Sequence, residues 1–296
     1  MAKIYQARPI KRRRRSNEEL AQLDEQIIAV LEQDHPQSVR HTFYVMTDPR
    51  LPAHVEKTEN GYDLVQRRIL MLRRAGRLPY GWITDATRRG YLVNTFNGKA
   101  DFLSRVKGLY RADLWANSNH YVEVWCESRS IAGVIEDDCD ELAVPLYPSG
   151  GFTSATLAHQ AAEHINAEYN FREVKIFYIG DYDQSGVLID KSIEAELREH
   201  LEPWIEMDFE RIGINREQIE LYDLPTKPRK ATDRRSPEIE FTVEAEAMPA
   251  HIMRELLRER VEALLPADAL RIARIAEEEE RKGLQALADV YKKNAA

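Results

Sequence analysis

Three carboxylates follow two segments of the chain that are typical of buried strands. Asp181 and Asp183 come directly after residues 174–179, and Glu127 ends the segment Tyr-Val-Glu-Val-Trp-Cys-Glu at 121–127. Ligands of open parallel sheets bind at the carboxyl ends of the strands. Mg²⁺ prefers oxygen ligands and commonly combines one or two carboxylates with substrate phosphates. The spacing therefore predicts a Mg²⁺ site, in which Mn²⁺ is the alternative ion, although an acidic turn has the same short pattern.

A tyrosine in the first part of the chain is a candidate nucleophile. Arg40 and Tyr44 lie one turn apart on a helix predicted to start at Pro36 and to stop before Pro49. A phenol with a pKa of ~10 is a weak nucleophile at neutral pH, and Arg40 could hold a phosphate and favour the phenolate. The alternative interpretation is an ordinary tyrosine of an amphipathic helix.

The elements around this tyrosine are three predicted helices and an extended segment. Ser16 and Glu19 form a capping box that opens the first helix, and the third helix covers residues 62–75. With residues 77–84 extended, the pattern fits a winged helix-turn-helix, whose last helix enters the major groove of DNA. Its basic residues are either DNA contacts or a solvated face: Arg67, Arg68, Arg73, Arg74, Arg77, Arg88 and Arg89.

From Tyr121 onward the pattern alternates between strands and helices, which predicts an α/β fold with a mostly parallel sheet. The predicted strands are 121–126, 143–147, 174–179 and 205–214, and the predicted helices are 130–136, 153–169, 185–200, 251–265 and 267–291. Residues 226–235 are interpreted as a flexible linker or as a clamp on the DNA backbone.

Composition and charge define the expected domains. The chain has 296 residues and a formal net charge of −8, but positive charge concentrates in the N-terminal part of the chain and at residues 227–235. We expect a basic arm at 1–15, which is a solvated tail or a DNA contact, a winged-helix domain at 16–115 and an α/β domain at 116–296.

Cys126 and Cys139 lack the spacing of a zinc site. Without an apolar run or a signal-peptide core, a cytoplasmic protein that does not enter membranes is expected.

Taken together, these motifs resemble a known family. Residues 121–127 and the segment Gly-Asp-Tyr-Asp-Gln-Ser-Gly at 180–186 resemble a TOPRIM domain. The segment Arg-His-Thr-Phe-Tyr at 40–44 resembles the tyrosine motif of topoisomerase VI A subunits and of the transesterases that make meiotic double-strand breaks. Residues 241–248 resemble a late acidic segment of the same TOPRIM domain, which makes Glu246 an accessory acid. The order of the motifs is similar to that of compact bacterial and phage members.

The resemblance implies a mechanism. Tyr44 would attack a DNA phosphodiester and form a 5′-phosphotyrosyl bond, while Glu127, Asp181 and Asp183 would hold Mg²⁺. The tyrosine and the acids would come from opposite subunits of a homodimer. Because the sequence has no phosphate-binding loop of an ATPase, strand passage would need a separate ATPase subunit. Ser128 stands where the family has a lysine and Gln184 where it often has a proline, so Arg129 is the candidate for the missing positive charge.

Two other functions fit the same residues. The first is a hydrolytic TOPRIM nuclease of a bacterial defence or phage system, in which water replaces Tyr44. The second is a catalytically inactive DNA-binding module.

Overall fold

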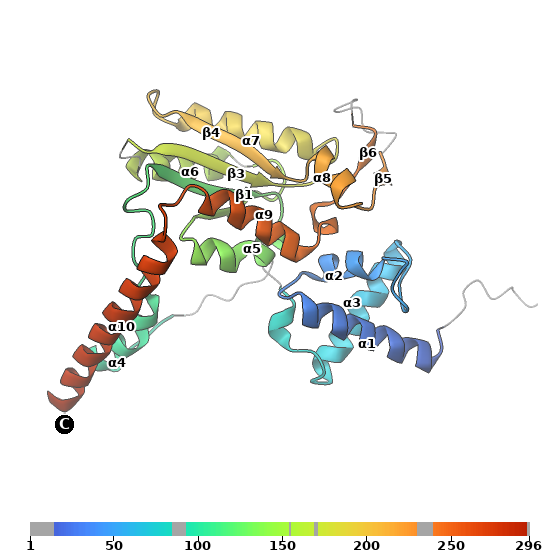
Figure 1. Cartoon of the computed structure of the whole chain (residues 1–296), viewed down its shortest axis with the longest axis horizontal. Helices are drawn as coiled ribbons and strands as arrows, with labels where there is room; N and C mark the ends of the chain where they lie inside the picture. Colours follow the sequence, from blue (N-terminus) through green and yellow to red (C-terminus); the bar gives the residue numbers. More distant parts are fainter. Residues whose placement is uncertain (1–14, 85–92, 154, 169–170, 230–238, 295–296) are drawn as a thin grey trace, which may run out of the picture. The chain divides into compact units, whose positions relative to one another are not determined.

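The computed structural model describes residues 15–84, 93–153, 155–168, 171–229 and 239–294 (Figure 1). The chain divides into two compact units, Met1–Ile83 and Thr84–Ala296, which are described separately below. The division falls earlier than the predicted boundary after residue 115. The reason is that helix α4 (Lys99–Val106) packs against the C-terminal helix α10 (Ala269–Asn294) and so belongs to the second unit.

The first unit consists mainly of three helices, α1 (Asn17–Gln33), α2 (Val39–Met46) and α3 (Glu59–Arg74). The predicted capping box opens α1: the N–H of Glu19 donates to Ser16 Oγ at 3.1 Å and the N–H of Ser16 donates to Glu19 Oε2 at 2.7 Å. Helix α2 begins later than predicted because Ser38 caps it. The buried apolar stripes of the three helices form one core, which includes Leu23, Ile27, Met46, Val65 and Ile69.

The segment predicted to be an extended wing has a different structure. Residues Tyr80–Trp82 form a 3₁₀ helix, η1, and Ile83 makes a single parallel bridge with Gln37. Ring contacts hold this turn against the helices, because Trp82 stacks on His35 with 4.5 Å between the ring centroids. Within residues 15–84, this prediction of an extended segment is therefore wrong. Residues 85–92, which include the predicted DNA contacts Arg88 and Arg89, lie outside the described residues.

The second unit contains a four-stranded parallel sheet in the order β2-β1-β3-β4, which confirms the α/β prediction. The strands are β1 (His120–Cys126), β2 (Leu146–Pro148), β3 (Glu173–Ile179) and β4 (Met207–Gly213). Strand β2 begins later than predicted. The N–H of Val144 instead donates to the carbonyl of Cys139 at 2.9 Å and so closes the preceding helix.

Helices cover both faces of this sheet (Figure 1). On one face, α6 (Ala155–Glu168) and α7 (Gly186–His200) pack on alternate residues of β1 and β3. The alanines of α6 leave room there for large rings such as that of Trp125. The other face carries α5 (Arg129–Glu141) and α9 (Ala250–Glu262), which contact each other.

Several shorter elements of the second unit have no counterpart in the sequence prediction. They are α4, the 3₁₀ helices η2 (Lys107–Leu109) and η3 (Ala245–Ala247), helix α8 (Arg216–Leu221), and the antiparallel pair β5 (Lys227–Pro228) and β6 (Phe241–Thr242). Residues 227–228 are thus paired, while residues 230–238 lie outside the described part of the chain. Among the described helices, none combines the length and the apolar character that a membrane span requires.

Candidate functional site

The register of two neighbouring strands brings two of the predicted acids together. Cys126, the last residue of β1, is level with Ile179, the last residue of β3. The N–H of Glu127 donates to the carbonyl of Ile179 at 2.9 Å, and the N–H of Asp181 donates to Glu127 Oε2 at 2.8 Å. The carboxyl edge of the sheet therefore carries Glu127 and Asp181 side by side, as the strand pattern predicts.

Backbone amides also bind the two aspartates of the loop. Asp181 Oδ1 accepts from the N–H of Ala245 at 2.8 Å. Asp183 Oδ1 accepts from the N–H groups of Ser185 and Gly186, at 2.8 and 2.6 Å, and so holds the start of α7. A Cβ on Gly186 would lie 2.1 Å from the carbonyl oxygen of Asp181, so only glycine fits this close approach.

The fourth acid, Glu246, reaches this edge through a backbone bridge. Tyr182 and Val243 exchange two hydrogen bonds of 2.9 Å, which fixes the segment before η3 against the acidic loop. Glu246 lies within η3 and is 8% exposed.

The acids share one electrostatic environment. Burial, together with the negative charges of Glu127, Glu246 and Asp183, raises the pKa of Asp181 to about 8. Burial is also the main reason why the pKa of Glu127 is raised. The hydrogen bond from the Asp181 N–H opposes that increase. A bound cation would relieve the repulsion among these carboxylates.

The donor types fit Mg²⁺, but the side chains do not converge as they stand. Among the residues that the structure describes, no group of three or more Asp, Glu, His or Cys side chains has an arrangement that could hold a metal ion. The hydrogen bonds explain this, because one oxygen each of Glu127, Asp181 and Asp183 points at a backbone amide. Coordination by all three would require at least one carboxylate to turn away from its amide.

Arg211 of β4 is a residue of the site that the sequence reasoning missed. Its Nη1 donates to the carbonyls of Gly180 and Asp181 at 3.1 and 3.2 Å, and its Nη2 donates to the carbonyl of Gly186 at 2.6 Å. Its Nε pairs with Asp190 of α7 at 2.6 Å, and both side chains are nearly buried. Arg211 therefore fixes both ends of the acidic loop. No local sequence signal marks this role, because the contacts span about thirty residues.

The two residues after Glu127 lie at the start of α5. Ser128 caps the helix by accepting from the N–H of Ile131 at 3.1 Å. Arg129 is the first residue of α5 and is exposed. A positive charge two residues after Glu127 is thus accessible at the acidic edge.

The tyrosine predicted to be the nucleophile is buried in the first unit. Tyr44 is 6% exposed, packs beside Phe43, and has the ammonium of Lys57 5.3 Å from its ring centroid. Arg40 is exposed, and its guanidinium lies 5.4 Å from the ring centroid of Tyr62. Arg40 therefore stacks on an aromatic face, one helical turn from Tyr44.

The predicted DNA-contacting arginines have two different environments. Arg68 forms a nearly buried ion pair with Asp24, in which Nε and Oδ1 are 2.6 Å apart, so it joins α3 to α1. Arg77 pairs with Glu25 of α1 at 2.6 Å. The nearly buried pair of Arg68 therefore has a structural role within the first unit. The pair of Arg77 lies at the surface, so contact of Arg77 with DNA stays a prediction.

The remaining described arginines of α3 face outward or cover a ring. Arg73 donates to the carbonyl of Tyr80 at 3.0 Å and lies 4.3 Å from the centroid of its ring. Arg67 and Arg74 are exposed. These three remain candidates for contacts with phosphate groups.

Comparison with protein-family models, with curated proteins and with solved structures finds no match to this chain.

Proposed function

We propose that the chain is a Mg²⁺-dependent DNA-cleaving enzyme with a TOPRIM-like second unit and an N-terminal unit related to winged helix-turn-helix domains. The observation that carries the proposal is the hydrogen bond between Asp181 and Glu127, which joins acids from neighbouring strands at the carboxyl edge of a parallel sheet. This edge is where parallel α/β folds bind ligands.

Each residue of the edge has a part in the proposed chemistry. Glu127, Asp181 and Asp183 would hold Mg²⁺ (or Mn²⁺), with Glu246 as an accessory acid. Once bound, the ion would supply charge neutralisation of a phosphodiester and of the leaving oxygen. The guanidinium of Arg129, at the start of α5, would pair with a phosphate oxygen. Arg211 would keep the loop in place through its carbonyl contacts.

For the nucleophile we propose Tyr44, on the strength of the Arg-His-Thr-Phe-Tyr motif and of the exposed Arg40 one turn away. Attack by the phenol would leave a 5′-phosphotyrosyl bond and a free 3′-hydroxyl, so religation needs no other energy source. The acids would then be supplied by the second subunit of a homodimer, and a separate ATPase subunit would be needed for strand passage. Arg67, Arg73 and Arg74 would contact the DNA backbone.

The burial of Tyr44 favours a second candidate, a hydrolytic nuclease. A phenol that is 6% exposed must move before it can reach a phosphate, whereas Glu127, Asp181 and Asp183 are each partly exposed. In this case the same acids and Mg²⁺ would activate water, and Tyr44 would be a core residue of the first unit.

One experiment distinguishes these candidates. Supercoiled plasmid is incubated with the protein and Mg²⁺ or Mn²⁺, denatured with detergent, and run on a gel with and without protease treatment. DNA that enters the gel only after proteolysis indicates the tyrosyl adduct, and Tyr44→Phe should abolish it while the control Tyr110→Phe does not. Free nicked DNA that persists in Tyr44→Phe identifies the hydrolytic nuclease. Plasmid that stays supercoiled under all conditions would leave only the inactive DNA-binding module.

A further inference from the structure

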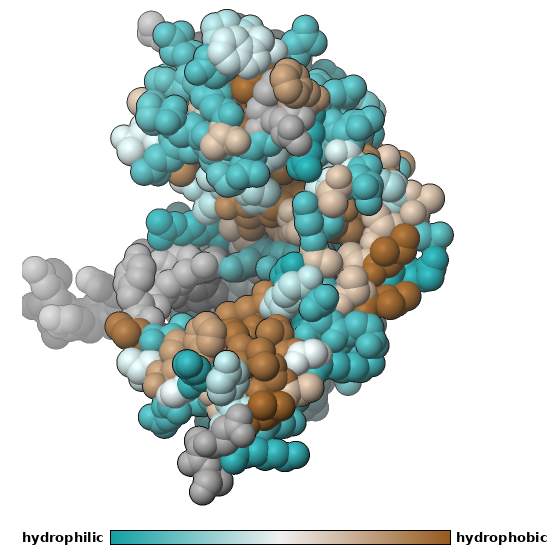
Figure 2. All heavy atoms as spheres, turned by 90° about the vertical axis from the view of Figure 1, so that its left-hand side faces the viewer, coloured by the Kyte–Doolittle hydropathy of each residue, from teal (hydrophilic) through white to brown (hydrophobic). Residues whose placement is uncertain are grey.

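Helices α4 and α10 form an arm that buries very little of its own apolar surface. The two helices contact each other along their lengths, yet Ala288 is the only residue of either helix that is fully buried among those described. Phe102 of α4 is 45% exposed, and Leu109, which follows α4 in η2, is 75% exposed. In Figure 2, which faces the left-hand side of Figure 1, apolar side chains gather over this arm. Exposed patches of this kind are typical of protein interfaces.

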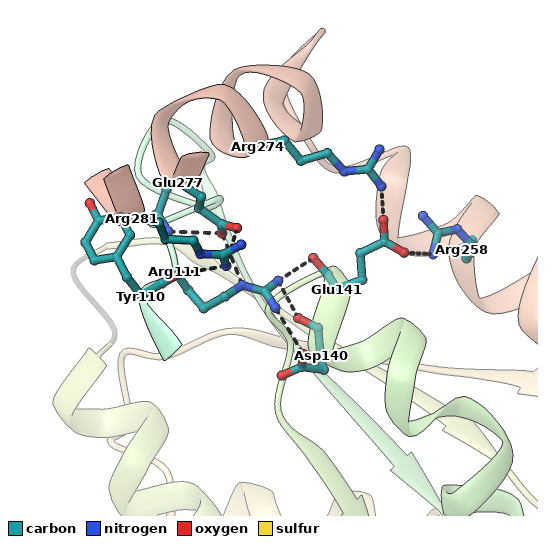
Figure 3. Close-up of polar contacts among 9 residues, drawn as sticks. Tyr110, Arg111, Asp140, Glu141, Arg258, Arg274, Glu277 and Arg281 are labelled. Carbon is teal, nitrogen blue, oxygen red and sulfur yellow. Dashed lines mark hydrogen bonds and ion pairs between the residues drawn. The ribbon is translucent and has the colours of Figure 1, made fainter. Parts of the chain in front are cut away.

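The inner face of α10 is fixed by polar contacts to the rest of the unit (Figure 3). Glu277 accepts from Arg111 Nε at 3.1 Å, and Arg281 donates to the carbonyl of Tyr110 at 2.9 Å. Arg274 pairs with Glu141 at the end of α5. Closer to the C-terminus, Gln285 accepts from Lys107 at 2.5 Å. These contacts determine which side of α10 faces the unit and which side faces away.

The opposite side of α10 carries an apolar stripe. Ile272, Ile275, Leu287 and Val290 are between 45% and 58% exposed, and their helical spacing places them on the side away from Arg281. The exposed Ala276 and Ala286 extend the stripe between them. An apolar stripe on the side of α10 that faces away from the unit is typical of a helix with a further partner.

The order of residues along the stripe indicates what that partner is. Ile272 and Val290 are equidistant from Arg281 in the sequence, and so are Ile275 and Leu287. An interface between two identical subunits related by a two-fold axis is self-complementary in this way, because residue i of one copy meets residue j of the other and the reverse. Two antiparallel α10 helices centred on Arg281 would place each of these apolar residues level with another.

The charges along α10 agree with this arrangement. Arg271 of one copy would lie within one helical turn of Asp289 of the other, which gives opposite charges at both ends of the interface. Glu279, the acid inside the stripe, is neutralised within its own helix because Lys282 Nζ lies 2.8 Å from it. We therefore propose that the exposed stripe of α10 is the surface through which two copies of this chain form an antiparallel dimer. The proposal does not depend on the proposed enzymatic function.

Sedimentation equilibrium of the full chain over a range of concentrations tests the proposal. The wild-type protein should change from the monomer mass of 34.3 kDa to twice that mass as the concentration rises. Ile275→Glu with Leu287→Glu should remove the dimer, because each charge would be buried against an apolar residue. The matched control is Leu221→Glu, which places the same charge on an exposed leucine of α8 and should leave the dimer intact. Circular dichroism of each variant verifies that it is folded.

Cysteine cross-linking tests the orientation in the same protein. Ile272→Cys combined with Val290→Cys should give a dimer linked by disulfides under mild oxidation. Ile272→Cys alone should give none, since two antiparallel copies would hold these positions roughly 27 Å apart along the helix axis. The two native cysteines, Cys126 and Cys139, are buried. A wild-type protein that is monomeric at every concentration, a dimer unaffected by the glutamates, or efficient cross-linking of Ile272→Cys alone would each overturn the proposal.

Discussion

The backbone N–H of Asp181 donates a 2.8 Å hydrogen bond to Oε2 of Glu127, and this bond joins acids that are far apart in the sequence. It exists because β1 and β3 are parallel neighbours that end at the same level. The two carboxylates are therefore held close together in a partly buried environment, where burial and the negative charge of Glu127 disfavour ionisation of Asp181. A divalent cation would relieve this repulsion.

The first prediction concerns the pH dependence that Asp181 gives to stability. Its pKa is raised from an ordinary value near 3.8 to about 8, so the folded protein binds this proton more tightly than the unfolded chain. The protonated Asp181 carboxyl makes its full contribution to stability below about pH 4, and this contribution is lost as the pH rises through about 8. Without added metal, the free energy of unfolding of Asp181→Asn should therefore exceed that of the wild type by about 2 kcal/mol at pH 9, which raises its unfolding temperature, and Asp181→Asn should lack that advantage at pH 5.

Thermal unfolding followed by circular dichroism at these two pH values measures the effect. Asp137→Asn is the control, because Asp137 is exposed on α5. Equal stabilities of Asp181→Asn and wild type at pH 9 would contradict the electrostatic description of the acidic edge.

A second buried acid, Glu123, gives a separate prediction on stability. Glu123 is fully buried under α6 and accepts hydrogen bonds of 2.9 Å from the Tyr121 hydroxyl and from the Trp125 indole N–H. Burial nevertheless raises its pKa to about 7. The protonated form therefore stabilises the fold below about pH 4.5, and up to roughly 3 kcal/mol is lost as the pH rises through 7.

Glu123→Gln should flatten this part of the stability profile, because glutamine does not ionise. Denaturant unfolding at pH 5, 6 and 7.5 measures the profile, with the exposed Glu199→Gln as the control. A Glu123→Gln profile as steep as that of the wild type would show that another group is responsible.

The third prediction concerns Arg211. Replacing it with alanine removes the contacts to the carbonyls at both ends of the acidic loop and leaves Asp190, which is 14% exposed, without its partner. We expect a loss of about 3 kcal/mol in stability. Any DNA cleavage should also need a higher Mg²⁺ concentration, because the loop that carries Asp181 is released.

Denaturant unfolding and a Mg²⁺ titration of plasmid cleavage measure both effects. Arg216→Ala, on the exposed start of α8, is the matched control. A variant Arg211→Ala with unchanged unfolding would mean that the carbonyl contacts do not stabilise the loop.

The fourth prediction separates two adjacent arginines of α3. Arg68 pairs with the nearly buried Asp24, so Arg68→Ala should destabilise the protein by about 2–3 kcal/mol. Arg67 is exposed, so Arg67→Ala should leave stability unchanged and should weaken DNA binding with a shallower salt dependence. Unfolding curves and fluorescence anisotropy with a labelled duplex measure the two properties. The reverse pattern would exclude α3 as the DNA-contacting helix.

Local patterns predicted the parts of the fold that depend on neighbouring residues. The sequence predicts β1, β3 and the capping box at Ser16, because strand burial and helix capping depend on residues that are close together in the sequence. The pairing of Glu127 with Asp181 followed from the general behaviour of parallel sheets.

Long-range contacts explain what the sequence did not reveal. Arg68 and Arg67 look alike in sequence, and only the position of Asp24 on α1 makes one of them structural. The role of Arg211 depends in the same way on carbonyls of a distant loop. Backbone N–H groups also donate to oxygens of Glu127, Asp181 and Asp183, and the spacing of these residues does not predict those hydrogen bonds.

The binding of Mn²⁺ by the protein without DNA is the most direct test of the central claim, because the spectroscopic signal of the free ion disappears on binding. Electron paramagnetic resonance is followed while Mn²⁺ is titrated into wild type and into the variant Glu127→Gln with Asp181→Asn, with Asp137→Asn as the control. The account predicts saturable binding by wild type and by the control, competition by Mg²⁺, and loss of binding in the double variant. Absence of binding by wild type, or equal binding by the double variant, would contradict it.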